Sequence, residues 1–141
     1  MIPAMQAMLE QQEGFRRKPY RDSRGFLTIG FGANLDAGIT REQARALMQC
    51  QLDANEPALL AFPWFAGLDP VRRSVIENMA YNMGVGGVLT FTDMIAAIEA
   101  KDWPEAARQM RASKWAVQVG KDRVDVLSDI METGEMPDAA V

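Results

Sequence analysis

Histidine is absent from this chain of 141 residues, and cysteine occurs once, at Cys50. Without histidine the chain lacks the commonest general base and the commonest protein ligand for transition metals. Ser-His-Asp, Cys-His and zinc-peptidase chemistry are therefore excluded. A single cysteine forms no intrachain disulfide, which fits synthesis in a reducing compartment, and we expect Cys50 to be a small apolar residue of a helix. We expect neither a metal nor any other cofactor.

Long apolar runs are missing as well. No stretch approaches the ~20 apolar residues of a membrane-spanning helix, and residues 1–6 lack the basic start and apolar centre of a signal peptide. The glycines at 84–87 do not have the spacing of a phosphate-binding loop. The net charge is −4, and no basic helix face carries interleaved aromatic residues. We therefore expect no membrane insertion and no nucleic-acid partner.

Helical periodicity dominates what is present. With 48% apolar residues the chain is long enough for one core and too short for two comfortable domains, so we expect a single domain over 1–141. Thr40 and Gln43 have the spacing of a capping box, and Asp69 before Pro70 is typical of a helix cap followed by the first helical residue. We expect that second helix to end at Gly84. A short helix is expected at about 92–100, another from about Asp102, a third after a cap at Ser113, and a last one that ends at Gly134. We expect the helical pattern to be interrupted at Glu56-Pro57 and Phe62-Pro63.

The segment from Glu13 to Gly32 brings two carboxylates and a hydroxyl close together in the sequence. Glu13 follows an apolar-periodic stretch and precedes a glycine, the residue type that commonly ends helices. Residues 22–25 have the composition of a tight turn, and 18–21 and 26–29 can form its two strands. If this sheet folds back beside the helix end, Glu13 and Asp22 face each other across a groove, as glycoside hydrolysis requires. Thr28 then adds a hydroxyl able to orient a water molecule.

Each of these three residues has a simpler interpretation when taken alone. Asp commonly initiates turns, Glu is usually exposed, and Thr is a good strand residue. A helix C-terminus favours cations, however, so an ionised carboxylate at Glu13 is locally unfavourable, which suits a proton donor. Taken together, Glu13, Asp22 and Thr28 favour carboxylate chemistry.

The spacing of these residues resembles that of a known family. Glu, eight residues, Asp, five residues and Thr, with Glu-Gly-Phe-Arg at the start and Thr-Ile-Gly-Phe-Gly at the end, is similar to the phage-type lysozymes, the T4 lysozyme-like endolysins. The resemblance extends from about Met5 to Glu135. It implies an α+β, mainly α-helical, two-lobed fold. We expect a small β lobe at about 14–38, a helical lobe at about 1–13 and 55–135, and a connecting helix at about 41–54.

The resemblance also implies an activity. The substrate would be bacterial peptidoglycan, cleaved at the β-1,4 bond between N-acetylmuramic acid and N-acetylglucosamine, with Glu13 as general acid and Asp22 with Thr28 positioning the water. An ion pair with Glu13 would come from Arg123 or, in its place, Lys121. The substrate-binding residues that the resemblance implies are Gly30, Phe31, Asn78, Tyr81, Asn82 and Gln109.

Several alternatives remain open. A lytic transglycosylase also uses an acidic Glu but needs no water-activating Asp, and a non-catalytic wall-binding module would release no fragments. As an endolysin, the chain would be a monomer made in the host cytoplasm and released to the cell wall through membrane lesions made by a holin-type protein. A virion-associated tail lysozyme is the other role in the same family.

Three features depart from the family's pattern. Many relatives carry His after the Gly-x-Gly, where this chain has Ala33, and the segment Leu35–Thr40 is short. The net charge is negative, unlike that of many wall hydrolases. A local basic cluster nevertheless lies beside the proposed site, and we interpret it either as a solvated hairpin face or as a surface that guides substrate; its members are Arg16, Arg17, Lys18, Arg21 and Arg24.

Overall fold

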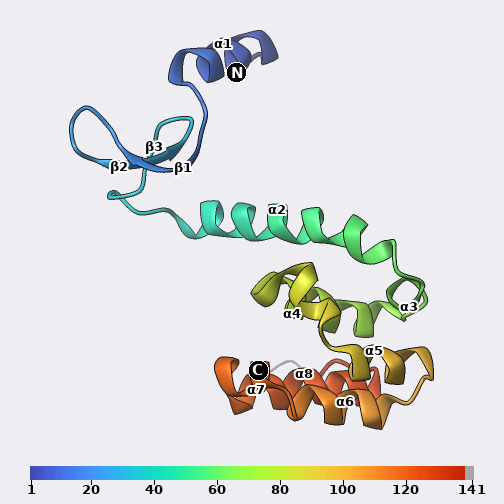
Figure 1. Cartoon of the computed structure of the whole chain (residues 1–141). Helices are drawn as coiled ribbons and strands as arrows, with labels where there is room; N and C mark the ends of the chain where they lie inside the picture. The colour runs from blue at the N-terminus through green and yellow to red at the C-terminus, as the bar shows by residue number, and fades with distance from the viewer. Residues whose placement is uncertain (139–141) are drawn as a thin grey trace. The chain divides into compact units, whose positions relative to one another are not determined.

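Helix α1 (Pro3–Glu13) opens the chain in the computed structural model, which describes residues 1–138. Figure 1 follows the elements in chain order, and they divide into two units, Met1–Leu47 and Met48–Val141. Pro3 occupies the first helical position, where its missing N–H leaves no bond unmade. Gly14 ends the helix with φ 71°, and its N–H donates to the Glu10 carbonyl at 2.9 Å. The predicted helix end is confirmed.

The first unit continues with a three-stranded antiparallel sheet in the order β1-β2-β3. Strands β1 (Arg16–Arg21) and β2 (Leu27–Gly30) form the predicted hairpin, in which Tyr20 pairs with Thr28. Strand β3 (Ala33–Asn34) was not predicted, because two residues of low strand propensity give no alternating pattern. It pairs with β2 because the chain reverses at Gly30 and Gly32, with φ of 69° and 84°.

Helix α2 (Arg41–Leu60) runs across the boundary between the two units. Its start is the predicted capping box, since the Gln43 N–H donates to Thr40 Oγ1 at 3.1 Å and the Thr40 N–H donates to Gln43 Oε1 at 2.8 Å. The expected interruption at Pro57 is wrong, because this proline lies inside the helix. It stands in the last turn, where only a single backbone bond is lost, and Leu59 just beyond it is fully buried. Buried packing therefore outweighs the local preference.

Over its described residues, the second unit consists of helices joined by short turns and contains no strand. Its caps were predicted: Asp69 accepts from the Arg72 N–H at 2.9 Å, Asp102 accepts from the Glu105 N–H at 3.2 Å, and Gly134 is left-handed with φ 73°. Ser113 caps its helix in the same way. The helices are α3 (Pro63–Ala66), α4 (Pro70–Leu89), α5 (Thr92–Glu99), α6 (Trp103–Arg111), α7 (Lys114–Val119) and α8 (Lys121–Thr133).

Two details of this unit differ from the sequence expectation. Phe62-Pro63 was expected only to interrupt the pattern, yet Pro63 begins the short helix α3, as proline can at a first helical position. Gly84 does break the helical path of α4, with φ 78° and ψ 163°, but helical structure resumes at once and continues to Leu89. The predicted stop is therefore a kink.

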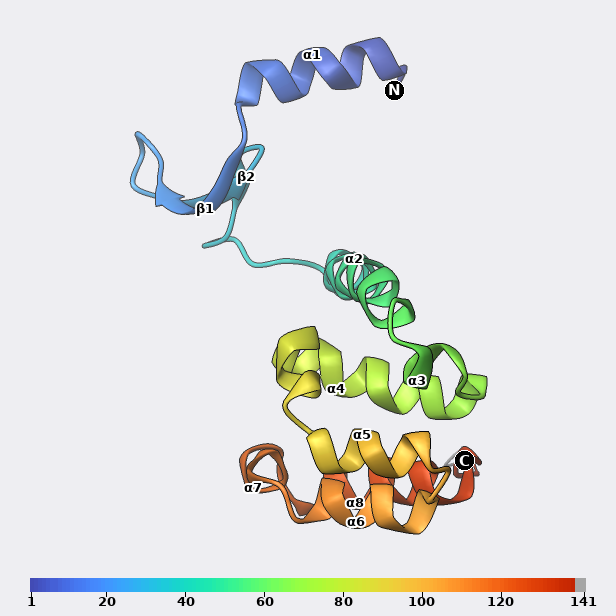
Figure 2. The ribbon, with the colours of Figure 1, turned by 45° about the vertical axis from the view of Figure 1, so that its right-hand side comes forward.

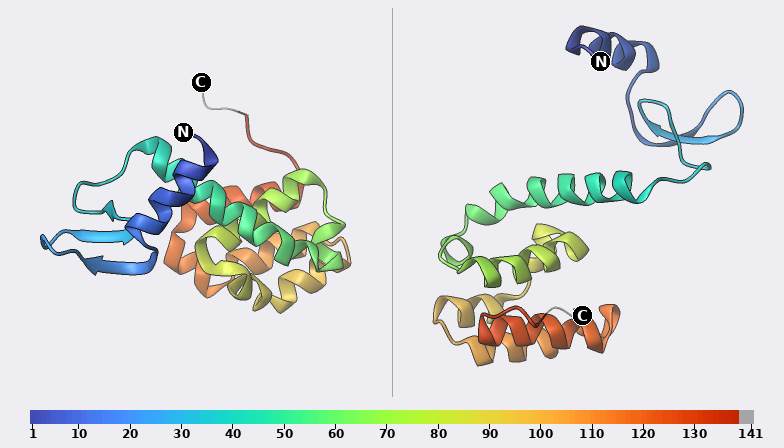
Figure 3. Two further views of the ribbon diagram at one scale, coloured as in Figure 1. Left: turned by 90° about the horizontal axis from the view of Figure 1, so that it is seen from above. Right: turned by 180° about the vertical axis from the view of Figure 1, so that it is seen from behind.

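The hydrophobic core of the described residues lies in the second unit. Figures 2 and 3 show α5 and α8 packed along α6, and α4 also contacts α8. The largest fully buried side chains are Phe65, Leu59, Ile76, Met79, Met94, Met110 and Met131. Four of the ten methionines thus fill the core. Among the described residues, no helix combines the length and apolar character needed to span a bilayer.

One arginine joins the beginning of α4 to the end of α8. Arg72 Nε donates to the Met131 carbonyl at 2.7 Å, and one of its terminal nitrogens donates to the Glu132 carbonyl at 3.0 Å. The other pairs with Asp69 at 3.0 Å, and the guanidinium lies 4.0 Å from the ring centroid of Trp103. Arg72 thereby satisfies carbonyls that the last turn of a helix leaves without an intrahelical partner. The mainly helical α+β class expected from the sequence is confirmed.

Candidate active site

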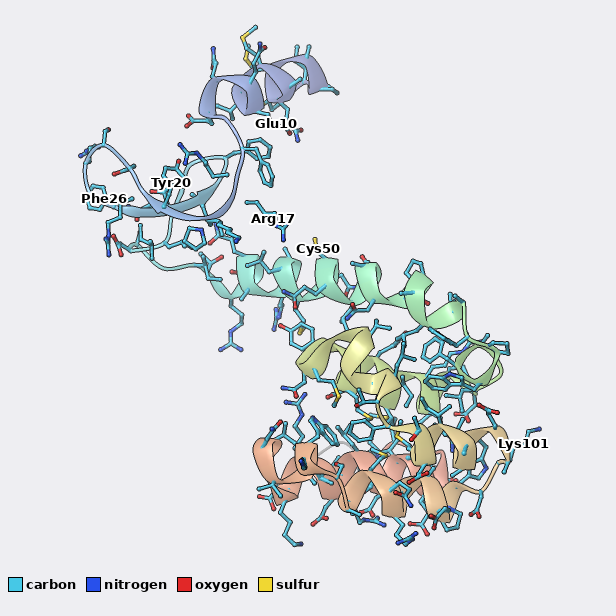
Figure 4. All side chains as sticks on the ribbon, in the orientation of Figure 1. Glu10, Arg17, Tyr20, Phe26, Cys50 and Lys101 are labelled. Carbon is cyan, nitrogen blue, oxygen red and sulfur yellow. The ribbon has the colours of Figure 1, made fainter. Side chains whose placement is uncertain are left out.

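Glu13 lies at the rim of a hollow in the first unit. As the last residue of α1 it is exposed, and the hollow of about 340 Å³ beside it is lined by Gln6, Leu9, Glu10, Glu13, Phe31 and Gly32. Figure 4 labels Glu10 on the same helix. A Cβ atom built on Gly32 would meet Glu13 Oε2 at 2.9 Å. Gly32 therefore allows the carboxylate to lie directly against the backbone, and its positive φ is a second reason for glycine there.

One residue that lines this hollow, Phe31, forms an aromatic pair. The rings of Phe15 and Phe31 have their centroids 5.4 Å apart and are tilted by 47°. Phe31 remains 47% exposed, so its ring is accessible to a bound molecule. A carboxyl group beside exposed aromatic surface is the combination that suits contact with a sugar, whose rings present apolar C–H faces and polar hydroxyls.

Asp22 holds the hairpin turn with one carboxylate oxygen. Its Oδ1 accepts from the backbone N–H groups of Arg24 and Phe26, both at 2.9 Å. Its main chain exchanges further bonds with Gly25 and Phe26 across the turn. Among the described residues, none donates a hydrogen bond to Oδ2. The interpretation as a turn residue is thus correct for one oxygen, and the other is available to a water molecule.

Thr28 lies in the centre of the small sheet. It is 3% exposed, pairs with Tyr20 on β1 and Asn34 on β3, and its hydroxyl donates to the Phe26 carbonyl at 2.9 Å. Phe26 therefore bonds to Asp22 through its N–H and to Thr28 through its carbonyl. This shared backbone group fixes the two side chains relative to each other. Within residues 1–138 we find no direct hydrogen bond between Glu13 and either of them.

Three candidate binding residues of the second unit lie along α4. Arg123 donates to Asn78 Oδ1 at 2.8 Å, and the Trp115 indole N–H donates to Asn82 Oδ1 at 3.0 Å. Trp115 is buried and belongs to the hydrophobic core. Each carboxamide thus has its oxygen occupied and its NH₂ group oriented away from that partner. Tyr81, between them in sequence, is 41% exposed.

Gln109 faces a different hollow of the second unit. This hollow measures about 420 Å³, and sequence reasoning missed it because its lining comes from four helices, α4 to α7, and the turns between them. The Gln109 amide donates to Glu105 Oε1 at 2.8 Å, and two nitrogens of Arg108 donate to the same carboxylate, each at 2.7 Å. The hydrogen bonds from Arg108 and then Gln109 lower the pKa of Glu105 to about 2. The other residues that line the hollow include Met83, Thr90, Phe91, Ser113, Trp115 and Gln118.

The two cations predicted as alternatives for pairing with Glu13 have different partners. Lys121 Nζ lies 2.7 Å from Asp125 Oδ2 one turn along α8, and this hydrogen bond raises the pKa of Lys121. Arg123 is half-buried and bonds to Asn78. Its pairing with Glu13 stays a prediction. Over residues 1–138, no group of three or more His, Cys, Asp or Glu side chains is placed to hold a metal ion.

Comparison with known proteins identifies the family to which this chain belongs. The sequence model of the family described as Phage lysozyme matches residues 10–129, which include every candidate site residue from Glu13 to Arg123. This chain belongs to the phage lysozyme family. The resemblance in the Glu13–Gly32 segment is confirmed, and membership of the phage lysozyme family supports a glycosidase with lysozyme-like activity.

Relatives of this phage lysozyme family member differ in length. It is 29% identical to "Probable T4-type lysozyme 1" of Dictyostelium discoideum, over 96% of this chain and 98% of that protein. It is 24% identical to "Probable T4-type lysozyme 2" of the same organism, with the same coverage. It is also 32% identical to "Pre-baseplate central spike protein Gp5" of Enterobacteria phage T4, over 94% of this chain but only 28% of that protein. The same domain thus occurs alone and within a much longer protein.

Proposed function

We propose that this chain is a muramidase, which hydrolyses the β-1,4 bond between N-acetylmuramic acid and N-acetylglucosamine in bacterial peptidoglycan. The observation that carries the proposal is the combination in one unit of an exposed Glu13 beside an aromatic hollow with Asp22, whose Oδ2 has no hydrogen-bond partner among the described residues. Membership of the phage lysozyme family supports it.

In the proposed reaction Glu13 transfers its proton to the glycosidic oxygen as the bond to the sugar carbon breaks. A water molecule attacks that carbon from the opposite face and gives a proton to Asp22, so the configuration inverts. Asp22 Oδ2 receives the proton, since Oδ1 is held by two backbone N–H groups. The Thr28 hydroxyl donates its one hydrogen bond to the Phe26 carbonyl, so the lone pairs of its oxygen are left to accept a hydrogen bond from that water.

Substrate contacts are proposed for both units. In the first unit Phe31 offers an exposed ring beside Glu13, and Gly30 offers backbone without a side chain. In the second unit the oriented NH₂ groups of Asn78 and Asn82 suit the carbonyl oxygens of N-acetyl groups. Tyr81 and Gln109 complete the proposed set. Arg123 is proposed to stabilise the ionised form of Glu13 after proton transfer.

We propose that the biological role is host lysis, as a monomeric endolysin that reaches the wall with the help of a holin-type protein. A virion-associated lysozyme is a second candidate, favoured by the similarity to a protein named as a central spike component. The chemistry at Glu13 is the same in both roles. An endolysin would cleave the wall from inside the host at the time of lysis. A virion-associated lysozyme would cleave it from outside, as part of the phage particle, during infection.

The test is digestion of purified peptidoglycan by the wild-type chain and by Glu13→Gln, with released ends identified by mass spectrometry. We expect reducing N-acetylmuramic acid ends from the wild type and a rate at least about a thousandfold lower from the variant, because the proton donor is removed. Anhydro ends from the wild type would indicate a transglycosylase. Binding to the wall without any fragments would indicate a non-catalytic module.

A further inference from the structure

The cations of the first hairpin, here called the basic hairpin, point to a contact with the substrate beyond its sugar backbone. The basic hairpin consists of Arg16, Arg17, Lys18, Arg21 and Arg24. We propose that it binds the carboxylates of the peptide stems that branch from the glycan strand. The inference rests on the proposed function, because it assumes that peptidoglycan is the substrate.

The first argument is that these cations have few partners of their own. Among the described residues, the only ion pair of the basic hairpin joins Arg21 to Asp36, and it is long at 3.7 Å. All five side chains belong to exposed residues. In the second unit, by contrast, four of the eight basic residues lie within 3.0 Å of a carboxylate oxygen: Arg72, Arg108, Arg111 and Lys121. The basic hairpin thus keeps charge that the fold does not neutralise.

The second argument is that this charge is presented on a rigid support. Arg21 donates to the Gly25 carbonyl at 3.0 Å, and Asp22 closes the same turn with two backbone bonds. The Arg16 guanidinium lies 4.7 Å from the ring centroid of Tyr20, and that of Arg24 lies 5.5 Å from that of Phe26. Figure 4 labels both rings on the hairpin. A guanidinium resting on a ring keeps its N–H edge free for a bidentate bond to a carboxylate.

The third argument is electrostatic contrast within the chain. Residues 14–38 hold five basic and two acidic side chains, a net charge of +3, whereas the whole chain has −4. An acidic protein is repelled by an anionic wall at long range, so only a local positive surface attracts the glycan strand to the site. The same hairpin carries Asp22 in its turn and Thr28 on its second strand. A glycan strand that reaches Asp22 and Thr28 therefore passes beside the cations of the basic hairpin.

Peptide-stem carboxylates fit this surface better than other anions. These carboxylates recur along the glycan strand that is cleaved, so the same cations can bind the carboxylates of another peptide stem after each cleavage. Four of the five cations are arginines, whose planar fork matches a carboxylate. Phosphate groups would bind the same forks, and the experiment therefore uses sacculi from which phosphate polymers have been removed.

The experiment measures binding in the Glu13→Gln background, so that the wall is not digested. The hairpin variant carries Arg17→Gln, Lys18→Gln and Arg24→Gln, which spare Arg21 and the turn bonds. The control variant carries Arg41→Gln, Arg45→Gln and Lys101→Gln, which change the net charge equally at exposed residues outside the hairpin. Each protein is sedimented with intact sacculi and with glycan strands stripped of their peptides. Thermal unfolding verifies that all variants are folded.

At low salt we expect the hairpin variant to bind intact sacculi about tenfold more weakly than the parent, and the difference to shrink as salt increases. The control variant should lose less than about twofold. On peptide-free strands all three should bind alike. An additional variant with Arg17→Lys and Arg24→Lys keeps the charge but loses the planar forks, so its binding should lie between that of the parent and that of the hairpin variant.

Equal losses in the hairpin and control variants would overturn the inference in favour of net charge alone. A hairpin deficit that persists on peptide-free strands, or that appears only when phosphate polymers are retained, would also contradict it. Failure of the proposed function has a separate signature. In that case the wild-type chain releases no N-acetylmuramic acid ends, whatever the hairpin variants bind.

Discussion

The two units of this protein differ in where they place their buried surface. Among the described residues of the first unit, Thr28 alone is buried to more than nine-tenths. The hydrophobic cluster of the described residues, from Leu59 to Met131, lies wholly in the second unit. The first unit carries the proposed acid and base, and these groups must reach water and substrate. The comparison indicates that local hydrogen bonds hold the proposed chemistry, whereas apolar packing holds the fold.

The largest expected effect comes from Asp22→Asn, which separates chemistry from structure within one side chain. Asparagine retains a carbonyl oxygen for the turn bonds to Arg24 and Phe26 but cannot accept a proton from water. We expect the hydrolysis rate to fall about a thousandfold with an unchanged melting temperature. Initial rates on purified peptidoglycan and a thermal melt measure both quantities. An active Asp22→Asn protein would remove Asp22 from the mechanism.

Phe65→Ala tests the other half of the comparison. Phe65 is fully buried in the second unit, so its truncation should lower the free energy of unfolding by about 3–5 kcal/mol. The matched control is Phe15→Ala, since Phe15 belongs to the first unit and is 65% exposed. That variant should lose less than about 1 kcal/mol. Denaturant unfolding compares the two, and similar losses would mean that the first unit has more buried structure than we describe.

Arg72→Met should give a smaller loss of stability, of about 2 kcal/mol. Methionine keeps an apolar stem beside Trp103 but removes the bonds to the Met131 and Glu132 carbonyls. The control is Arg108→Met, which removes only an ion pair with Glu105 on the surface of one helix. If chemical denaturation shows equal losses for both variants, the link between α4 and α8 does not stabilise the unit.

The smallest expected effect concerns pH. Burial raises the pKa of Glu77, with Glu56 adding to the shift and Arg73 opposing it. A carboxyl with a raised pKa in the folded state favours folding while protonated, below its ordinary value of 4.5, and that benefit is lost as pH rises through the folded value. Glu77→Gln should therefore raise stability at neutral pH by about 0.5 kcal/mol after allowance for solvent screening, and should leave it unchanged near pH 3. Urea unfolding at several pH values tests the sign, and a loss at neutral pH would reverse it.

Sequence reasoning succeeded where the determining contacts are local. The capping residues Thr40, Asp69 and Ser113 each act on a backbone group within three positions, and all three were predicted. The turn at Asp22 is likewise local. These interactions depend on a short spacing of residue types, which can be read directly from the chain.

Long-range contacts account for what could not be predicted. Arg72 meets carbonyls 59 and 60 residues away, and no spacing in the sequence signals that bond. Pro57 was judged on its local effect, whereas the burial of Leu59 keeps the helix intact. In the candidate site, the hollow beside Glu13 depends on the reversal at Gly32, which also creates the unforeseen strand β3. Glu13, Asp22 and Thr28 were identified by their residue type and spacing. The contacts around them depend on the folded backbone and could not be predicted from the sequence.

The two oxygens of Asp22 carry an implication for how this domain can change over evolutionary time. Because Oδ1 alone holds the turn, a single substitution to asparagine would leave the hairpin shape intact while removing the proposed base. The substitution would then remove the activity without changing the backbone conformation. A descendant recruited only to hold on to the wall would be indistinguishable from its active ancestor by shape, and this one position in its sequence would tell them apart.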